Sequence, residues 1–439
     1  MVLILLGLIA SCDVLNQEPE SLIPTTSAIT DARSAESALN GLYNSVQDGD
    51  LYGGRFIMAN EMLANNATAA AFQAFWSELA SGNVPASNFH LEDMWVSAYA
   101  AINAANAIIE QVPDISDIEQ GDADRIMGTA YFFRAMMHFD LLRQFGEFFD
   151  ANSSFGVPLA LEQSLEIREI PRSSVANTYQ QINEDLQLAR DLLPNQGNKF
   201  YASQGAAQAL QARVSLYQED YETAEQMASS VISNGAYSLP ADYNEVYTAE
   251  GSGESILELN FIELVDPNAW AINMYASPPE VAVDDDLIDF FNNQGETERA
   301  ILFEEINSLF RCTKYGDDPN TNGTNTILFR LSEMHLIRAE ALALQNGGTP
   351  DDALPDLNVV AARAEHGNYT GFANEDDLIT ALLNERRAEF AFEGHYWFDL
   401  VRLGRMESEL GRPSFRRVLP IPLRELSITD GTLVQNPGY

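Results

Sequence analysis

Lysine is almost absent from this chain of 439 residues, which contains only Lys199 and Lys314. All other basic residues except histidine are arginine, and 24 basic residues stand against 65 acidic ones, for a formal net charge of -41. A surface field of that sign repels nucleic-acid phosphates and anionic lipid headgroups. The composition therefore argues against nucleic acid as a partner.

Two interpretations of the missing positive charge remain open. The first is an ordinary acidic extracellular protein. The second is a protein adapted to high salt, in which dissolved ions screen the repulsion between carboxylates. The chain is 46% hydrophobic and has the composition of a folded protein, so its scarcity of lysine favours the second, halophilic interpretation.

Cysteine is also scarce, and its positions indicate a lipid anchor rather than a disulfide. Cys12 follows the apolar run 2–10, which is shorter than the roughly 20 residues that span a bilayer but suits a secretory signal peptide. Residues 9–12, IASC, resemble a bacterial lipobox, whose cysteine thiol carries a lipid such as palmitate. Lipidation of Cys12 would leave Cys312 without an intramolecular partner.

This interpretation divides the N-terminus into a lipoprotein signal peptide, residues 1–11, and a lipidated tether, residues 12–30. The tether is polar, contains two prolines and lacks helical periodicity. The alternative is a buried N-terminal strand. The first basic residue is Arg33, so no positive charge precedes the apolar run and the true start codon stays open.

Signatures of catalysis are missing from the sequence. It contains no Walker A loop, no G-x-S-x-G elbow and no G-x-G-x-x-G motif after a strand. The five histidines, at 90, 138, 335, 366 and 395, lack a close metal-ligand spacing. Adjacent carboxylates, such as Asp284, Asp285 and Asp286, arise by composition among 65 acidic residues. We therefore predict a protein that is not an enzyme and carries no cofactor.

One stretch partly matches a calcium-binding loop. Asp318, Asn320 and Asn322 occupy positions one, three and five, and Gly323 follows at position six. Position twelve is Phe329 instead of the bidentate glutamate, which excludes a complete EF-hand. A weaker site completed by distant oxygens stays open beside the simpler alternative, a turn rich in asparagine and aspartate.

Helical periodicity dominates the rest of the chain. Residues 204–233 indicate two helices around a turn near 218–220, and Ala212 and Ala224 lie twelve residues apart where the helices would touch. The same spacing recurs at Ala341 and Ala353. Helix, short turn and helix with alanine at the crossing is typical of tetratricopeptide-like repeats, which stack because one pair cannot bury its own face.

The sequence character changes twice along the chain. We expect an N-terminal helical region at 31–235, a variable, loop-rich insert at 236–325 with a strand in SILELNF, and a C-terminal helical region at 326–439. The fold class is therefore mainly α, a helical-repeat superhelix of about four helix pairs with an irregular part that carries minor strands.

Several segments together resemble the SusD/RagB family of nutrient-binding outer-membrane lipoproteins. They are FRLSEMHLIRAEAL, NERRAEFAFEGHYWFDLVRLGR, LPIPLREL and the terminal QNPGY, supported by TAYFFRAMMHFDLLRQFGE and by the predicted lipobox. The resemblance covers nearly the whole mature chain. One departure is Tyr396, where the family usually has arginine, so a local ion pair is expected to be missing.

The resemblance implies a lipid-anchored protein on the cell surface. It would cap a SusC-like TonB-dependent transporter of the outer membrane and capture an oligosaccharide or a peptide for uptake. The family binds its ligand without catalysis, and its ligand contacts vary between members, so no binding residue can be transferred by position.

Aromatic rings outside the repeat helices are the best ligand candidates, because sugar rings stack an apolar face on them while amides bind the hydroxyls. Two groups fit this pattern: Asn65, Asn66, Phe75 and Trp76, and then Asn268, Trp270 and Tyr275. The alternative is that these rings pack on the scaffold, as Trp95 and Trp397 are expected to do.

The stretch 384–405 mixes four arginines with acids and aromatic rings. Glu385, Glu389 and Glu393 lie four residues apart, within reach of Arg386 and Arg387 on a helix, which indicates an architectural role. A tetratricopeptide scaffold that binds protein instead of nutrient, or a peptide-binding family member, remains the alternative function, and the sequence does not identify the ligand.

Overall fold

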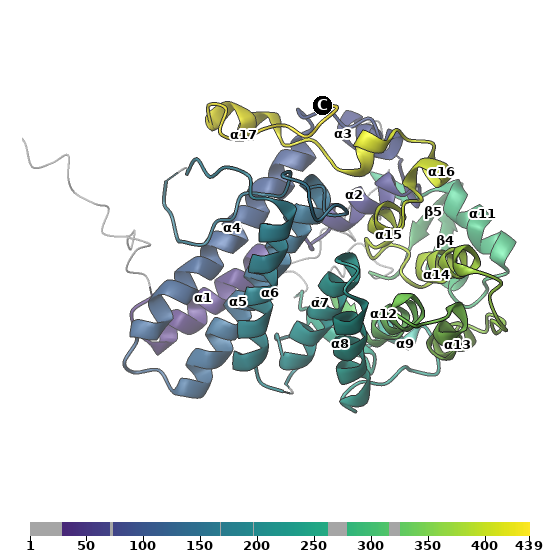
Figure 1. The fold of residues 1–439 in the computed structure, drawn as a ribbon, viewed down its shortest axis with the longest axis horizontal. Helices are drawn as coiled ribbons and strands as arrows, with labels where there is room; N and C mark the ends of the chain where they lie inside the picture. Colours follow the sequence, from purple (N-terminus) through teal and green to yellow (C-terminus); the bar gives the residue numbers. More distant parts are fainter. Residues whose placement is uncertain (1–28, 71–72, 167, 196, 262–278, 316–324) are drawn as a thin grey trace, which may run out of the picture.

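The protein is described by a computed structural model that covers residues 29–439 apart from 71–72, 167, 196, 262–278 and 316–324. It is mainly helical, as predicted (Figure 1). The α-helices are α1 Ala32–Val46, α2 Arg55–Leu63, α3 Ala74–Ser81, α4 Phe89–Gln111, α5 Gln120–Phe145, α6 Val175–Leu192, α7 Gln204–Tyr217, α8 Tyr221–Ser233, α9 Glu245–Thr248, α11 Asp285–Gln294, α12 Leu331–Leu344, α13 Leu354–Arg363, α14 Glu375–Glu389, α15 Tyr396–Arg402, α16 Met406–Leu410 and α17 Leu423–Ile428. Short 3-10 helices are η2 Val112–Asp114, η3 Ala300–Leu302, η4 Pro350–Ala353 and η5 Ser414–Arg417.

The N-terminal half is a layer of long helices, α1, α4, α5 and α6, that lie side by side (Figure 1). Asp31 caps α1 in a capping box with Ser34. Helix α4 stops at Gln111, immediately before η2, which contains Pro113. Helix α5 is buried along most of its length and forms the centre of this layer.

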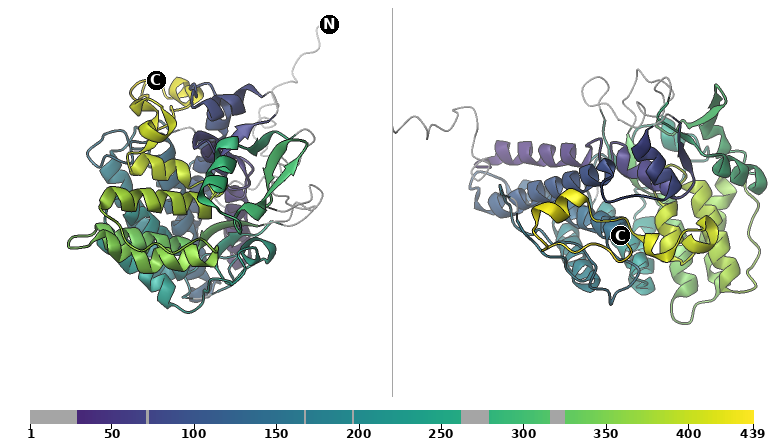
Figure 2. Two further views of the ribbon diagram at one scale, coloured as in Figure 1. Left: turned by 90° about the vertical axis from the view of Figure 1, so that its right-hand side faces the viewer. Right: turned by 90° about the horizontal axis from the view of Figure 1, so that it is seen from above.

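The two predicted helix pairs are confirmed. Helices α7 and α8 pack together around the turn at 218–220, and Ala212 and Ala224 are both fully buried. Helix α12 packs on α8 and is followed by η4 and α13, with Ala341 and Ala353 again fully buried. The pairs continue the helical layer toward the C-terminal half, as the end-on view in Figure 2 shows.

Strands are few and short, and among the described residues they form two small antiparallel sheets. The larger has the order β1-β3-β5-β4, from β1 Ala67–Ala69, β3 Val281–Val283, β5 Leu309–Cys312 and β4 Phe303–Ile306. The smaller pairs β2 Ser255–Leu259, the strand predicted in SILELNF, with β6 Thr326–Arg330. The larger sheet lies at one side of the helical scaffold (Figure 2).

One large apolar core, from Ile29 to Leu433, joins the two halves, and a smaller cluster lies under α12, α13 and α14. Trp95 and Trp397 are both buried in the large core, as expected from the sequence. The scaffold is therefore continuous, and the loops and sheets are held on it.

Candidate ligand-binding site

Strand pairing brings distant parts of the chain together at β1. Ala67 lies opposite Val283, the Ala70 N–H donates to the carbonyl of Glu280 at 2.9 Å, and the Asp284 N–H donates to the carbonyl of Asn66 at 2.9 Å. The first predicted ligand group, which begins at Asn65, therefore lies beside residues 280–284. These residues follow the second predicted ligand group in the sequence. Asn268, Trp270 and Tyr275 themselves fall outside the described residues.

Trp76 packs in the interior rather than facing solvent. Its side chain is 2% exposed, its ring stacks on His90 at 3.9 Å between centroids, and its Nε1–H donates to Glu280 Oε2 at 3.4 Å. Phe75 is half-buried and packs edge-to-face on Phe89 at 4.2 Å. In this structure Trp76 fixes α3 against β3 and leaves no face open for a sugar ring, whereas the Phe75 and Phe89 pair reaches the surface.

The two adjacent asparagines have different surroundings. Asn66 is fully buried, donates from Nδ2 to Glu61 Oε2 at 2.8 Å and accepts from Arg387 Nε at 2.9 Å. Asn65 is half-buried with a left-handed φ of 54°, a conformation that asparagine tolerates better than most residues. Its Oδ1 accepts a hydrogen bond from Arg412 at 3.0 Å.

Asn65 contributes to a cavity of about 300 Å³, which we call the Asn65 cavity. Its walls come from the end of α2 and from α11, α14, α15 and α16. The half-buried Arg387 guanidinium lies between the rings of Phe290 and Tyr396, with its Cζ 4.7 Å from each ring centroid. The bond from Nε to Asn66 and the two rings fix the orientation of this guanidinium.

Tyr396 thus receives a cation–π contact where the sequence suggested a missing ion pair. Burial raises the pKa of Tyr396 above its usual value, although Arg387 acts in the opposite direction, so the phenol stays neutral and keeps its proton. The contact makes Tyr396 a wall of the Asn65 cavity.

The Asn65 cavity is lined by groups that accept and donate hydrogen bonds. Asp286, Asp289 and Glu409 supply carboxylate acceptors, Asn293 and Gln294 supply amides, and Arg387 supplies donors. Two aromatic walls beside many hydrogen-bonding groups match a molecule with an apolar face and several hydroxyls.

Sequence reasoning missed Arg387 because it treated Arg386 and Arg387 as one architectural unit. Neighbouring residues on a helix point about 100° apart, so the two cannot face the same surroundings. Arg386 is buried and donates to Asp399 Oδ2 at 2.7 Å, whereas Arg387 reaches the cavity. Helical spacing alone would have predicted that Arg386 and Arg387 have different surroundings.

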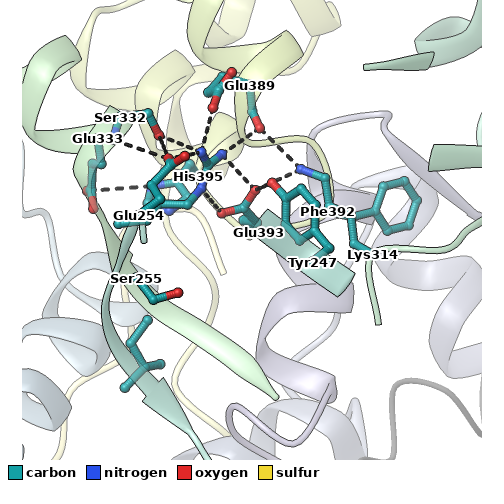
Figure 3. A network of polar contacts seen from close by, with 12 residues as sticks. Tyr247, Glu254, Ser255, Lys314, Ser332, Glu333, Glu389, Phe392, Glu393 and His395 are labelled. Atoms are coloured by element: carbon teal, nitrogen blue, oxygen red, sulfur yellow. Dashed lines mark hydrogen bonds and ion pairs between the residues drawn. The ribbon is translucent and has the colours of Figure 1, made fainter. Parts of the chain in front are cut away.

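The same stretch anchors a buried ion-pair network (Figure 3). Glu389, fully buried, forms ion pairs with Arg299, Arg330 and Arg363. Although burial alone would raise the pKa of Glu389, the three guanidinium groups hold that pKa well below its usual value. Glu389 is therefore ionised and cannot act as a general acid near neutral pH.

Glu393 closes the network on the side of β6 (Figure 3). It accepts hydrogen bonds from Arg330 at 2.8 and 2.9 Å, from Lys314 Nζ at 2.7 Å and from the Tyr247 hydroxyl at 2.9 Å. These residues come from segments far apart in the sequence. The network therefore joins those segments to the end of α14 and to the turn after it, which contains Glu393. Helical spacing predicted that these glutamates and Glu385 pair with Arg386 and Arg387. This prediction is wrong.

Helix α14 stops at Glu389, and Phe392 takes a left-handed φ of 63°. Gly394 has a left-handed conformation, with φ 78°, and its N–H donates to Glu61 Oε1 at 2.7 Å. This bond ties the turn to α2, next to Asn66.

Metal ligands do not gather anywhere in the described part of the chain, where no group of three or more His, Cys, Asp or Glu side chains could hold an ion. Asp318, Asn320 and Asn322, the weak calcium candidates, lie outside the described residues, as does Cys12. Cys312 is buried, and burial raises the pKa of its thiol to about 12. Across the described segments, every helix is too short or too polar to span a bilayer.

Comparisons with known proteins agree with this fold. Residues 13–216 match a family described as starch-binding and associating with the outer membrane, and residues 292–416 match the SusD family. SusD-like protein P2 of Formosa agariphila is 25% identical, with 100% of this chain and 98% of that protein aligned. The starch-binding protein SusD of Bacteroides thetaiotaomicron is 31% identical over 26% of this chain and 22% of its own.

Solved structures give the same result. A SusD superfamily protein from Bacteroides thetaiotaomicron aligns with a TM-score of 0.82 at 26% identity, covering 93% of this chain and 100% of that one. A laminarin-binding SusD-like protein shares the fold, with a TM-score of 0.74 at 23% identity, and covers 93% and 100% of the two chains. Both family matches, the full-length relatives and the shared helical-repeat fold show that this chain belongs to the SusD/RagB family.

Proposed function

We propose that this protein is a glycan-binding lipoprotein of the outer membrane, which captures an oligosaccharide at the cell surface for uptake through a SusC-like TonB-dependent transporter. The family description, starch-binding and associating with the outer membrane, supports the ligand class and the location. Binding without turnover fits the buried Glu389, whose carboxylate is ion-paired with three arginines.

The observation that carries the proposal is the Arg387 guanidinium, held between Phe290 and Tyr396 at the Asn65 cavity. Its orientation is set before any ligand arrives, so binding costs little side-chain entropy. The cavity lies directly beside β1, where the first predicted ligand group and the flank of the second meet. We therefore place the main glycan contacts there.

Arg387→Met is expected to weaken oligosaccharide binding about ten- to a hundredfold. Methionine can still pack between the two rings, but it removes charged donors, whose hydrogen bonds contribute about 1.5–3 kcal/mol each. Isothermal titration calorimetry against a panel of oligosaccharides measures the effect. Arg125→Met, which removes a guanidinium from α5, is the matched control and should keep wild-type affinity. Equal affinities of Arg387→Met and the wild type would refute this placement.

Two alternatives are separated by the same assay. A peptide-binding family member would bind oligopeptides and ignore glycans, and a tetratricopeptide scaffold would bind neither while still retaining a protein partner. Release of shorter glycans by the purified protein would contradict a binding function altogether. Co-purification with a large outer-membrane transporter from native membranes tests the proposed partner.

Lipid anchoring at Cys12 has its own test. Cells that express the full chain are expected to incorporate labelled palmitate into the protein, and Cys12→Ala should abolish the label and release the protein from the membrane fraction. Label that persists in Cys12→Ala would contradict the anchor without affecting the proposed ligand.

A further inference from the structure

Helix α4 presents an uncharged side to solvent. It contains no charged residue between Asp93 and Glu110, although 20% of the chain is charged. On its outward side Val96 and Ala100 are exposed and Ala107 is half-buried, at spacings of four and seven residues that place them in one stripe. The exposed side of a helix normally carries charged or polar side chains, so this stripe indicates a surface that another segment covers.

The stripe leads into a groove of about 340 Å³, which we call the α4 groove. Its other walls are part of the loop between α5 and α6, and the last turns of the chain around α17. Tyr99, Ile170 and Ile428 line it and are half-buried, beside the exposed Val96 and Ala100. The groove is therefore open and largely apolar, and it shares no lining residue with the Asn65 cavity.

The N-terminal segment joins the body of the protein close to this groove. Residues 1–28 lie outside the described part of the chain, and the Ile29 N–H donates to Gln111 Oε1 at 3.3 Å. Gln111 Nε2 donates to Gln163 Oε1 at 2.7 Å, and the Gln163 N–H donates to Glu110 Oε1 at 2.7 Å. The segment before Ile29 therefore starts where the end of α4 meets the loop that forms one wall of the groove.

The length of this segment matches the distance to the groove. Leu22 and Ile23 are the nearest large apolar residues before Ile29, and Ile23 precedes it by six residues, or about 20 Å of extended chain. The proline after Ile23 favours an extended backbone there. The rise of α4 from Gln111 back to Tyr99 is about 18 Å. An extended segment that runs back along α4 therefore brings Leu22 and Ile23 to the groove.

The size of the α4 groove favours an occupant from the same chain. The groove has room for only a few side chains, whereas stable complexes of separate proteins bury about 800 Å² on each partner. A segment connected by a few residues has an effective concentration in the millimolar range, so weak contacts are enough to keep it bound.

We propose that residues 21–28 dock back along the outward side of α4, with Leu22 and Ile23 in the α4 groove. Docking leaves residues 12–20 and the side of the groove to span the distance to a membrane, about 30 Å of extended chain, in place of about 56 Å for residues 12–28. It would hold the body of the protein closer to the membrane. This consequence rests on the proposed lipid anchor at Cys12, whereas the docking itself does not.

Disulfide trapping tests the position of the segment. Ser21→Cys is combined with Val96→Cys in the full chain, with Cys12→Ser to remove a competing thiol, while Cys312 is buried. A disulfide requires Cα atoms within about 7 Å. Ser21→Cys with Val359→Cys is the matched control, because Val96 and Val359 are each 42% exposed and Val359 lies on α13. We expect the bridge to position 96 to form at least about tenfold faster than the bridge to position 359.

Protection from proteolysis tests the contacts in the groove. Thermolysin cleaves before large apolar residues, so it reports whether Leu22 and Ile23 are accessible. Ala100→Glu places a charge in the groove at an exposed position and is expected to raise the rate of cleavage at these two residues about tenfold. Val359→Glu is the control and should leave the rate unchanged. An unchanged melting temperature of Ala100→Glu shows that its fold is intact.

Two results would overturn the proposal. They are equal rates of bridge formation at positions 96 and 359, and a cleavage rate that Ala100→Glu leaves unchanged. If that variant instead lost a co-purifying outer-membrane protein while the cleavage rate stayed the same, the groove would bind a separate partner and the docking would be wrong. Failure of the glycan site or of the lipid anchor is recognised separately, by the calorimetry of Arg387→Met and by the palmitate label.

Discussion

Glu393→Ala is expected to lower the free energy of unfolding by about 3–5 kcal/mol while leaving intrinsic ligand affinity nearly unchanged. The carboxylate is buried, and its removal leaves Lys314 without its only ion-pair partner among the described residues and takes one carboxylate from Arg330. A charge that loses its partner in a dry interior costs far more than the pair itself contributes. The residue does not line the Asn65 cavity, where the main glycan contacts are proposed.

Urea denaturation at fixed salt measures this loss, since guanidinium would change the ionic strength. Glu184→Ala, which removes an exposed glutamate from α6, is the matched control and should change the unfolding free energy by less than about 0.5 kcal/mol. If Glu393→Ala lost affinity but kept its stability, the architectural role of this stretch would be wrong.

The stability difference between wild type and Glu393→Ala should depend on pH because of the ion pairs that Glu393 forms. Burial alone would raise the pKa of Glu393, but Arg330 and Lys314 act more strongly, so its pKa in the folded protein lies below its usual value. A carboxylate with a lowered pKa stabilises the fold above its unfolded pKa, near 4.3, and loses this contribution as the pH falls. The stability gap between wild type and Glu393→Ala should therefore narrow below about pH 4.3.

The melting temperature is expected to rise by about 10 °C or more between dilute buffer and 2 M potassium chloride. The chain has a net charge of -41, and several of its few basic residues are buried beside carboxylates, so they do not offset the acidic groups at the surface. Lys314 is buried, Lys199 donates to the carbonyls of Ser252 and Gly253, and three arginines surround Glu389. The remaining surface carboxylates repel one another until salt screens them.

Differential scanning calorimetry across a salt series checks this expectation. Sucrose at matched osmolality is the control, because it favours the compact state by exclusion but screens no charge. A melting temperature that stays constant from dilute buffer to molar salt would remove the high-salt interpretation and favour an ordinary acidic extracellular protein.

The helices show which features of the fold can be predicted from local sequence. Asp31 at the start of α1, Pro113 after α4 and the alanine pairs at the α7–α8 crossing act within a few residues of their own positions. Their effects are set by local backbone geometry and by the period of apolar side chains, which the sequence contains directly. For this reason the fold class could be predicted from the sequence.

Trp76 illustrates the limit of that approach. The sequence left open whether its ring contacts ligand or packs on the scaffold. Its burial depends on a segment about two hundred residues later, because Glu280, just before β3, accepts the indole hydrogen bond, and β3 pairs with β1, on which α3 packs. No local pattern specifies such a contact, so the outcome for Trp76 required the tertiary structure.

The helical-repeat class, the family and the excess of acidic residues follow from the sequence, because periodicity, motifs and composition are properties of neighbouring or summed residues. The partners of Glu389 and Glu393, and the contact of Arg387 with Asn66, follow only from the tertiary structure. Those partners come from positions far away in the chain: Arg330 lies 59 residues from Glu389, and Asn66 lies 321 residues from Arg387. Only the folded chain brings such charges and amides to within hydrogen-bonding distance.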